Sequence, residues 1–400
     1  MRGSGKKPAF QRPWTGEPVT GIDLEEHAMN KVIVAPDSFK GSLSARQVAD
    51  LIVAEVVAHF PGCTVVNMPL ADGGEGSVEA IISAVGGRIV MAEVLSPDDR
   101  TITAGFGVTP ANQAVLEVAA SSGITRQSDL HPITSSTFGF GQLIRRALDL
   151  GLRDFFLCLG GSATTDAGCG MAAALGARFL DAAGVSFLPC GATLQQVSSV
   201  DLSGIDRRVR DSKFTVMSDV ENPLYGAHGA ASVYSPQKGA SPAQVATLDR
   251  GLRHIAEVFR NMSGIDYSPI AGAGAAGGLG FGCKVILDAC LESGIDAILK
   301  LCHFKEALEG ADLIITGEGQ LDDQSFSGKA LSGILRAAGN TPVISICGTC
   351  VAPESQLRAH NLRVFETGAD ISAAESMRRP AKYLGRATAK ALEALSQTIS

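Results

Sequence analysis

The stretch LCLGGSATTDAGCGMAAALGARF, from Leu157 to Phe179, joins an apolar run to a turn of small polar residues and then to an alanine-rich run. This order predicts a strand, a turn from Gly160 to Asp166 and a helix from Gly168 to Phe179. Backbone N–H groups and hydroxyls in such a turn lie at the positive end of the helix, where proteins bind anions such as phosphate. A plain strand-to-helix connection capped by Ser or Thr explains the pattern equally well. Other segments of the sequence are needed to distinguish an anion site from a simple connection.

Three other apolar runs are also followed by polar loops that contain glycine. The runs and their loops are 31–35 with 36–42, 64–70 with 71–77, and 312–316 with 317–329. Helices are expected after the first two loops, one capped by Ser44 and one over residues 78–85. Alternation of strand, loop and helix is typical of a parallel sheet with crossover helices, and ligands bind where the strands of such a sheet end. We therefore expect these loops to bind a ligand.

The pattern changes in the middle of the chain, where residues 88–95, 101–108 and 114–118 form short alternating runs that predict antiparallel strands. We therefore predict an α/β protein with two α/β domains. The first is a parallel-sheet domain of flavodoxin-like or Rossmann-like type, formed by residues 29–86 and 283–400. The second is a mixed α/β domain, residues 87–282, inserted into the first. Residues 1–28 lack a signal-type apolar core and are interpreted as a disordered leader or an added extension.

Composition restricts the class of protein. The chain has 400 residues, a formal net charge of −7, one Trp and four Tyr. An acidic chain with few aromatic residues is unsuited to nucleic acid or to an anionic membrane surface, because both require a basic face. No apolar run approaches the roughly 20 residues of a membrane-spanning helix, and the nine cysteines are scattered along the chain. We expect a cytoplasmic protein that binds neither nucleic acid nor membrane.

Short motifs for other chemistries are absent or weak. The phosphate-loop pattern G-x-x-x-x-G-K-[ST] does not occur, and neither does the G-x-S-x-G pattern of hydrolases with a Ser nucleophile. Gly272, Gly274 and Gly277 fit the letters of the dinucleotide fingerprint, but the segment before them is a poor strand. Cys347 and Cys350 have redox spacing without a thioredoxin-like pattern around them, which favours a packing role.

What remains is a set of acidic, basic, amide and hydroxyl side chains on glycine loops that follow apolar strands. Phosphoryl transfer requires such a set: backbone amides and a lysine for the phosphates, carboxylates for Mg²⁺, and a carboxylate that accepts the proton of the attacking hydroxyl. The residues are Asp37, Ser38, Lys40, Asp72, Glu75, Asp166, Asp219, Asn222, Glu318 and Asp322.

At these residues the sequence resembles the type-1 glycerate kinase family. The matching motifs occur in the family's order: 35–42 (APDSFKGS), 69–76 (PLADGGEG), 159–168 (LGGSATTDAG), 218–224 (SDVENPL), 272–279 (GAGAAGGL) and 316–322 (TGEGQLD). The resemblance implies ATP-dependent phosphorylation of D-glycerate with Mg²⁺, in a cleft between two α/β domains of which one is inserted into the other. The chain departs from the family at Gln142, where the family often has Glu, and at Ala167, where it often has Gly.

Within this resemblance we expect catalytic roles for Asp37, Lys40 and Asp219, and metal ligation by Asp72 and Asp166. The residues expected to bind substrate or phosphate are Ser38, Gly73, Gly74, Glu75, Gly160, Gly161, Ser162, Thr164, Thr165, Asn222, Gly274, Gly277 and Glu318. Which aspartate is the base, and which loop holds ATP rather than glycerate, stays open. Lys40 has an alternative role in a structural ion pair, and Glu318 and Asp322 have an alternative role as loop caps. The carboxylate of glycerate also requires a partner, and Arg100 and Lys238 are candidates by their position in loops.

Several alternatives stay open at this point. The product is 2-phosphoglycerate or 3-phosphoglycerate, because the choice of hydroxyl depends on placement that a sequence does not specify. A dinucleotide-dependent oxidoreductase is a second hypothesis, resting on Gly272, Gly274 and Gly277, and a non-catalytic metabolite-binding protein is a third. D-glycerate and ATP are the expected partners, and a homo-oligomer is an option that the sequence leaves open.

Overall fold

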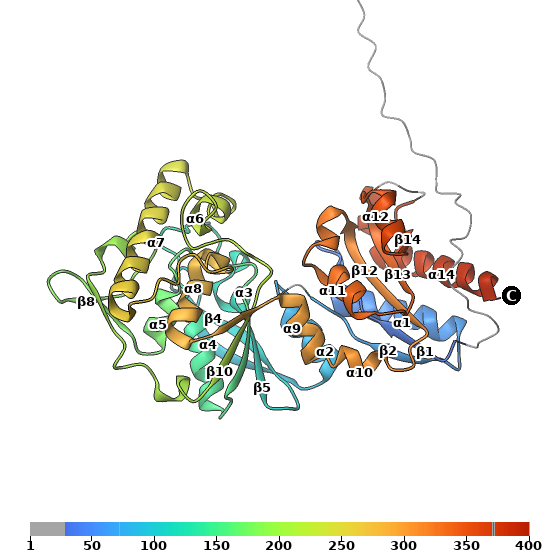
Figure 1. The fold of residues 1–400 in the computed structure, drawn as a ribbon, viewed down its shortest axis with the longest axis horizontal. Helices are drawn as coiled ribbons and strands as arrows, with labels where there is room; N and C mark the ends of the chain where they lie inside the picture. Colours follow the sequence, from blue (N-terminus) through green and yellow to red (C-terminus); the bar gives the residue numbers. More distant parts are fainter. Residues whose placement is uncertain (1–28, 72, 370, 372, 400) are drawn as a thin grey trace, which may run out of the picture.

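The structure is a computed structural model that describes residues 29–399, with the exception of 72, 370 and 372. The described residues form two lobes, each organised around its own sheet, which confirms the predicted α/β class with two α/β units (Figure 1). The predicted leader, residues 1–28, and Asp72 lie outside the described residues. We call the lobe that holds both ends of the described chain the first lobe, and the other the second lobe.

The first lobe is built on a five-stranded parallel sheet in the order β14-β13-β12-β1-β2. Its strands are β1 (Lys31–Val34), β2 (Thr64–Asn67), β12 (Leu313–Leu321), β13 (Val343–Cys350) and β14 (Arg363–Glu366). Ile33 of β1 lies opposite Ile314 of β12, and both side chains are fully buried. The central strands are continuous apolar runs because helices cover both faces of a parallel sheet.

Successive residues of β1 face opposite layers of helices. Val32 packs with α1 and α14, whereas Ile33 packs in the core that includes α2, α9 and α11. A capping box of Ser44 and Gln47 begins α1 at the predicted position. The helices of this lobe are α1 (Ala45–His59), α2 (Ser77–Val85), α9 (Gly294–Leu301), α10 (Phe304–Leu308), the 3₁₀ helix η5 (Asp323–Phe326), α11 (Ala330–Ala337), α12 (Glu354–Ala359), α13 (Ala373–Arg378) and α14 (Pro380–Ile399).

The second lobe is built on a six-stranded mixed sheet in the order β11-β10-β6-β5-β4-β3. Its strands are β3 (Arg88–Leu95), β4 (Thr101–Val108), β5 (Gln113–Glu117), β6 (Asp154–Cys158), β10 (Lys213–Met217) and β11 (Cys290–Glu292). The strands β3, β4 and β5 run antiparallel to their neighbours, as predicted, and the three pairings that join β5, β6, β10 and β11 are parallel. A separate antiparallel sheet consists of β7 (Arg178–Leu180), β8 (Ser186–Phe187) and β9 (Ser199–Asp201).

Helices α4 and α8 pack in the core of the second-lobe sheet, and α7 packs on α8 through Phe259 and Phe281. The elements are α3 (Val118–Ser122), η1 (Ile124–Arg126), α4 (Phe138–Asp149), α5 (Cys169–Ala174), η2 (Leu194–Gln196), η3 (Arg207–Val209), α6 (Ala230–Tyr234), η4 (Pro236–Lys238), α7 (Pro242–Ser263) and α8 (Ala275–Leu287). Among the described residues of both lobes, no helix has the length and apolar character needed to cross a membrane.

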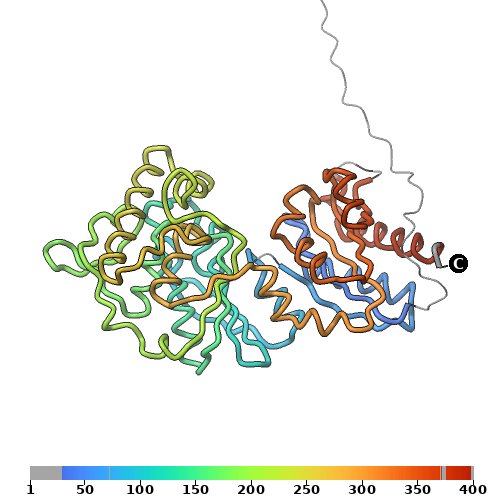
Figure 2. The backbone as a smooth tube through the Cα atoms, viewed as in Figure 1, coloured from blue at the N-terminus to red at the C-terminus, as the bar shows by residue number. Residues whose placement is uncertain are grey.

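The chain passes between the lobes twice, as the backbone trace shows (Figure 2). It leaves the first lobe after α2, near Gly86. The sequence-based boundary for its return, residue 283, falls inside α8, which continues to Leu287, and β11 then pairs with β10 of the second-lobe sheet. We therefore propose Ser293, the residue before α9, as the point at which the first lobe resumes.

Two predicted elements differ from the structure. The helix expected over 168–179 is the short α5, because the chain turns at Gly176 and continues as β7. Gly176 has a φ of +110°, and a Cβ there would lie 2.1 Å from the carbonyl oxygen of Gly204, so this turn requires glycine. The loop expected from Gly317 onward begins as strand, since β12 continues to Leu321 beside β13.

Candidate active site

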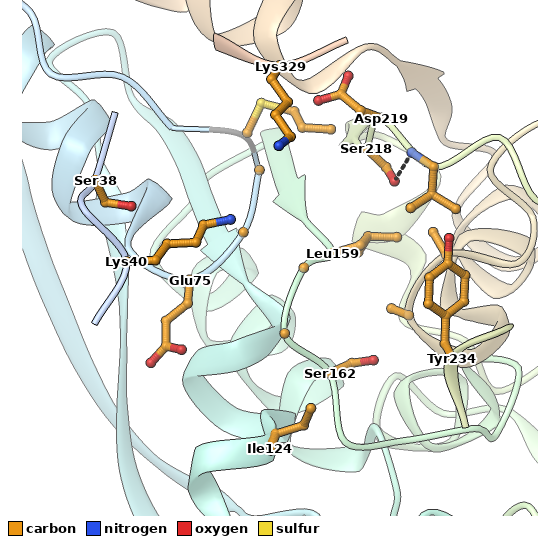
Figure 3. Close-up of a pocket in the computed structure, with 18 of the residues that line it drawn as sticks. Ser38, Lys40, Glu75, Ile124, Leu159, Ser162, Ser218, Asp219, Tyr234 and Lys329 are labelled. Carbon is orange, nitrogen blue, oxygen red and sulfur yellow. Dashed lines mark hydrogen bonds between the residues drawn. The ribbon is translucent and has the colours of Figure 1, made fainter. Parts of the chain in front are cut away.

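A cleft of about 940 Å³ lies between the two lobes (Figure 3). The first lobe contributes residues 38–44, 73–75 and 327–329 with Gln324; the second contributes 159–162, 217–220, Ile124, Tyr234, Gln237, Lys238, Ala275 and Ala276. Many of these residues directly follow the carboxyl ends of strands, as expected for an α/β sheet. Of the residues predicted for the site, the cleft brings together Ser38, Lys40, Gly73, Gly74, Glu75, Gly160, Gly161, Ser162 and Asp219.

Two glycine loops, one from each lobe, meet backbone to backbone at the cleft. The N–H of Gly160 donates to the carbonyl oxygen of Gly73 at 3.1 Å. A Cβ on Gly160 would lie 2.5 Å from the Cα of Gly74, so only glycine permits this approach. The contact joins the loop after β2 to the loop after β6 and sets how the two halves of the site face each other.

Glu117 anchors the first of these loops. Its carboxylate accepts hydrogen bonds from the N–H groups of Gly76, at 3.2 Å, and Val78, at the beginning of α2. Burial raises the pKa of Glu117 above its ordinary value, while the two N–H donors act in the opposite direction. Because Glu117 lies at the end of β5 in the second lobe, the interaction also connects the two lobes.

Replacing Glu117 with alanine should therefore destabilise the junction. The substitution leaves two N–H groups at a helix N-terminus without their acceptor, and we expect the free energy of unfolding to fall by about 1–3 kcal/mol. Urea denaturation of the Glu117→Ala variant measures this change. Glu79→Ala is the matched control, because Glu79 is exposed in the first turn of the same helix. Equal stabilities for the two variants would contradict an anchoring role.

The turn from Gly160 to Asp166 has an outer and an inner half. Gly160, Gly161 and Ser162 line the cleft, whereas Thr164, Thr165 and Asp166 are fully buried. Contacts to residues 122–124 hold the turn in place, since Ile124 donates to the carbonyl oxygen of Gly161 and Ala163 donates to that of Ser122. Only the outer half can contact a ligand in this arrangement.

Asp166 has a structural position rather than the predicted metal-binding one. Its carboxylate accepts hydrogen bonds from the N–H and hydroxyl of Thr137, both at 2.8 Å, and from the N–H groups of Gly168 and Gly170. Burial raises the pKa of this carboxyl. The predicted anion site at the start of the helix is thus taken by the protein's own carboxylate, and α5, with six residues, is shorter than expected. We assign Asp166 to positioning of the turn.

Three lysines line the cleft, two from the first lobe and one from the second. Lys40, at the left of Figure 3, and Lys329, at its top, both extend toward the centre of the cleft. The ammonium of Lys329 lies 3.9 Å from Asp322, and its side chain is 35% exposed. Lys238, one of the two residues predicted as a partner of the substrate carboxylate, lines the cleft from the second lobe, and its side chain is buried. The other candidate, Arg100, pairs with Asp98 outside the lining.

Asp219 and Glu75 are the carboxylates that line the cleft among the described residues. The Oδ1 atom of Asp219 accepts hydrogen bonds from the hydroxyl of Ser293, at 3.0 Å, and the N–H of Gly294, at 2.9 Å. These contacts place Asp219 at the N-terminus of α9, where a negative charge is stabilised. In Figure 3 the carboxylate of Glu75 is directed away from Lys40, and that of Asp219 lies near Lys329.

Other predicted residues lie just outside the lining. The Oδ1 atom of Asp37 accepts a hydrogen bond from the N–H of Ser38. Glu318 accepts one from the hydroxyl of Ser325, and burial raises its pKa. Asp322 caps η5, which is the structural role considered for this loop. These contacts give the loop after β12 a defined shape next to the cleft.

Asn222, Gly274 and Gly277 lie outside the cleft lining and contact residues in or next to it. Asn222 accepts a hydrogen bond from the hydroxyl of Tyr234 at 2.6 Å and so orients a ring that lines the cleft. A Cβ on Gly274 would lie 2.4 Å from the carbonyl oxygen of Pro223, and one on Gly277 would lie 2.0 Å from that of Thr164. These glycines serve close packing, and no strand leads directly into them, so the dinucleotide-fingerprint interpretation has no structural support.

Six residues that were not predicted from the sequence also line the cleft: Ser218, Tyr234, Gln237, Gln324, Ser327 and Lys329. A signal existed for Lys329, which follows Ser327 and Gly328 in the third glycine loop. Gln142 accepts a hydrogen bond from the N–H of Leu95 and lies outside the cleft lining. This residue, at which the chain departs from the family, therefore has a structural role and does not line the cleft. No cluster of three or more metal-ligating side chains occurs among the residues that the structure describes.

The sequence and the fold of this chain are similar to those of known glycerate kinases. The sequence profile of the glycerate kinase family matches residues 32–396. A glycerate kinase of Bacillus subtilis is 41% identical over 337 residues, which cover 83% of this chain and 88% of the relative. The glycerate 2-kinase of Escherichia coli is 39% identical, with the same coverage of 83% and 88%. The crystal structure of a candidate glycerate kinase 2 from Salmonella typhimurium LT2 superposes with a TM-score of 0.81 at 35% identity, covering 92% of this chain and 98% of that one.

Proposed function

The chain belongs to the glycerate kinase family and is an enzyme of that family, and we propose that it transfers the γ-phosphoryl group of ATP to the 2-hydroxyl of D-glycerate. The observation that carries the proposal is the convergence of Lys40, Lys329 and two glycine loops on one cleft between the lobes. Phosphoryl transfer depends mainly on positioning and on cations and N–H groups that stabilise charge on the phosphates. ATP as the donor also favours the cytoplasmic location expected from the sequence.

The 2-hydroxyl is proposed because the Escherichia coli relative, 39% identical, is named a glycerate 2-kinase. Transfer to this hydroxyl yields 2-phosphoglycerate and ADP. The acceptor hydroxyl gives its proton to a basic group of the cleft as the oxygen–phosphorus bond forms, and the bond between the γ-phosphorus and the bridging oxygen breaks, leaving the electron pair on ADP.

Mg²⁺ is expected to accompany ATP, and Asp219 is the carboxylate of the cleft that fits it best. Hydrogen bonds from Ser293 and Gly294 fix its orientation, and it lies next to the loop that carries Lys329. Proteins usually hold Mg²⁺ with one or two carboxylates, the remaining ligands being substrate phosphates and water. A single anchored carboxylate near a phosphate-binding lysine matches that arrangement. The bound ion would neutralise negative charge on the phosphates.

The proposal is tested by a coupled assay of ADP release with ATP, Mg²⁺ and D-glycerate. We expect ADP release that depends on D-glycerate and saturates with it. Glycerol, which has the hydroxyls but no carboxylate, is the control acceptor. A folded protein that binds D-glycerate without releasing ADP would contradict the proposal and would instead be a metabolite-binding protein.

A further inference from the structure

Lys238 is a cation buried at the second-lobe side of the cleft. It ends η4, is 3% exposed, and still contributes to the cleft lining. Its ammonium donates to the hydroxyl of Ser162 at 2.9 Å and to the carbonyl oxygen of Thr164 at 2.6 Å. These two contacts direct the side chain into the glycine turn after β6, whose outer half faces the cleft.

The charge of Lys238 is not neutralised by a carboxylate among the described residues within ion-pair distance. The carboxylate that acts on it electrostatically is Asp166, whose oxygens already accept hydrogen bonds from Thr137, Gly168 and Gly170. Burial lowers the pKa of Lys238 to about 7. An ammonium has three N–H donors, and the two hydrogen bonds to Ser162 and Thr164 use two of them. An anion at the floor of the cleft would therefore stabilise the charged form.

The surroundings of Lys238 suit one carboxylate better than a chain of phosphates. A buried lysine supplies a single positive charge, and a monoanion neutralises it without burying additional charge. A nucleoside triphosphate brings several negative charges, which match the pair of more accessible lysines, Lys40 and Lys329, on the first-lobe side. Figure 3 shows these two lysines on the side of the cleft opposite Ser162 and Tyr234.

We infer that Lys238 and Ser162 bind the carboxylate of the acceptor acid, and that the first-lobe wall with Lys40 and Lys329 binds the phosphates of ATP. This assignment rests on the proposed function and specifies which side of the cleft takes each substrate. It also makes the carboxylate, rather than the hydroxyl pattern alone, the feature by which the enzyme selects its acceptor.

The test compares Michaelis constants for the two substrates in wild type and in Lys238→Met, which keeps most of the length of the side chain and removes its charge. We expect the KM for D-glycerate to rise about 30-fold or more, since one partner of a buried charge pair is lost. The KM for ATP should stay within about threefold. Lys329→Met is the matched substitution on the opposite wall and should show the reverse, a higher KM for ATP with little change for D-glycerate. Lys300→Met, at a lysine 72% exposed on α9, is the control for the substitution itself.

A second readout uses D-glyceramide, the neutral amide of the acceptor. Wild type should prefer D-glycerate strongly in kcat/KM, and Lys238→Met should lose most of that preference. A merely structural lysine would not change this ratio. Should Lys238→Met fail to fold, Ser162→Ala carries the test, with an expected rise in the KM for D-glycerate of about threefold to tenfold and none for ATP.

The outcomes separate this inference from the proposed function. Wild type that releases no ADP with D-glycerate removes the proposed function, and the inference with it. If the wild type releases ADP with D-glycerate, the result for Lys238→Met tests the carboxylate assignment alone. A KM that rises for ATP only, for both substrates equally, or for neither overturns that assignment and leaves the proposed function in place.

Discussion

Replacing Asp219 with asparagine is expected to lower kcat by about 100-fold or more while the fold is retained. The carboxylate oxygen that accepts from Ser293 and Gly294 has a counterpart in the asparagine side chain, so the contacts at the start of α9 can persist. What disappears is the negative charge next to the loop of Lys329, which the proposed Mg²⁺ requires. Steady-state kinetics at saturating ATP and D-glycerate, together with a thermal melt, measure both effects.

Two controls sharpen the interpretation of this variant. Asp296→Asn removes a carboxylate from the first turn of α9, the helix whose first N–H group donates to Asp219. Asp296 pairs with Arg336 at the surface, so this variant should leave kcat within about twofold. A titration with Mg²⁺ separates metal binding from base catalysis. Asp219→Asn should require more Mg²⁺ for half-maximal rate if the residue holds the ion. An unchanged requirement with a lower kcat would assign Asp219 to the acceptor proton instead, and an unchanged kcat would remove it from the mechanism.

Gly160→Ala is expected to lower kcat/KM by about 100-fold, through geometry alone. A Cβ at this position would lie 2.5 Å from the Cα of Gly74 and 3.2 Å from the carbonyl oxygen of Gly73. Both neighbours are backbone atoms, so the two glycine loops have to move apart, and with them the two walls of the cleft. The walls carry the residues that we assign to the two substrates, and a displacement on the order of 1 Å between reacting groups is sufficient for such a loss.

Gly62→Ala is the matched control for this substitution. Gly62 lies in the turn before β2, and a Cβ there meets nothing within 4 Å. Neither glycine has a φ in the left-handed region, so the two variants differ mainly in the space around the added methyl group. Gly62→Ala should retain full activity and stability. Equal activity of the two variants would show that the contact between the loops is not required for catalysis.

The sequence predicted the strands and the loops that follow them because continuous apolar runs and glycine-containing turns are local features. Lys40, Gly160 and Asp219 lie on such loops at the ends of strands, and the parallel sheets bring the loops to one cleft. The role of Asp166 was not accessible in this way. Its hydrogen-bond partner Thr137 is 29 residues away, and only the fold shows that the carboxylate faces inward.

The burial of Lys238 is a similar case. Nothing in the local sequence distinguishes it from an exposed lysine after a proline, and its contacts with Ser162 and Thr164 span more than 70 residues. Tyr234 is placed by Asn222, a residue that the sequence selected for direct binding. Local patterns therefore identify which loops form the site, whereas tertiary packing decides which side chains on them face a ligand.

The most direct test of the central claim is a proton-coupled phosphorus NMR spectrum of the product made from ATP and D-glycerate. We predict ADP together with a phosphomonoester whose signal is a doublet, because the carbon at position 2 bears a single hydrogen. A triplet would show transfer to the 3-hydroxyl and would correct the proposed regiochemistry. ATP that remains unchanged, or that yields only ADP and inorganic phosphate, would contradict phosphoryl transfer to D-glycerate in this cleft.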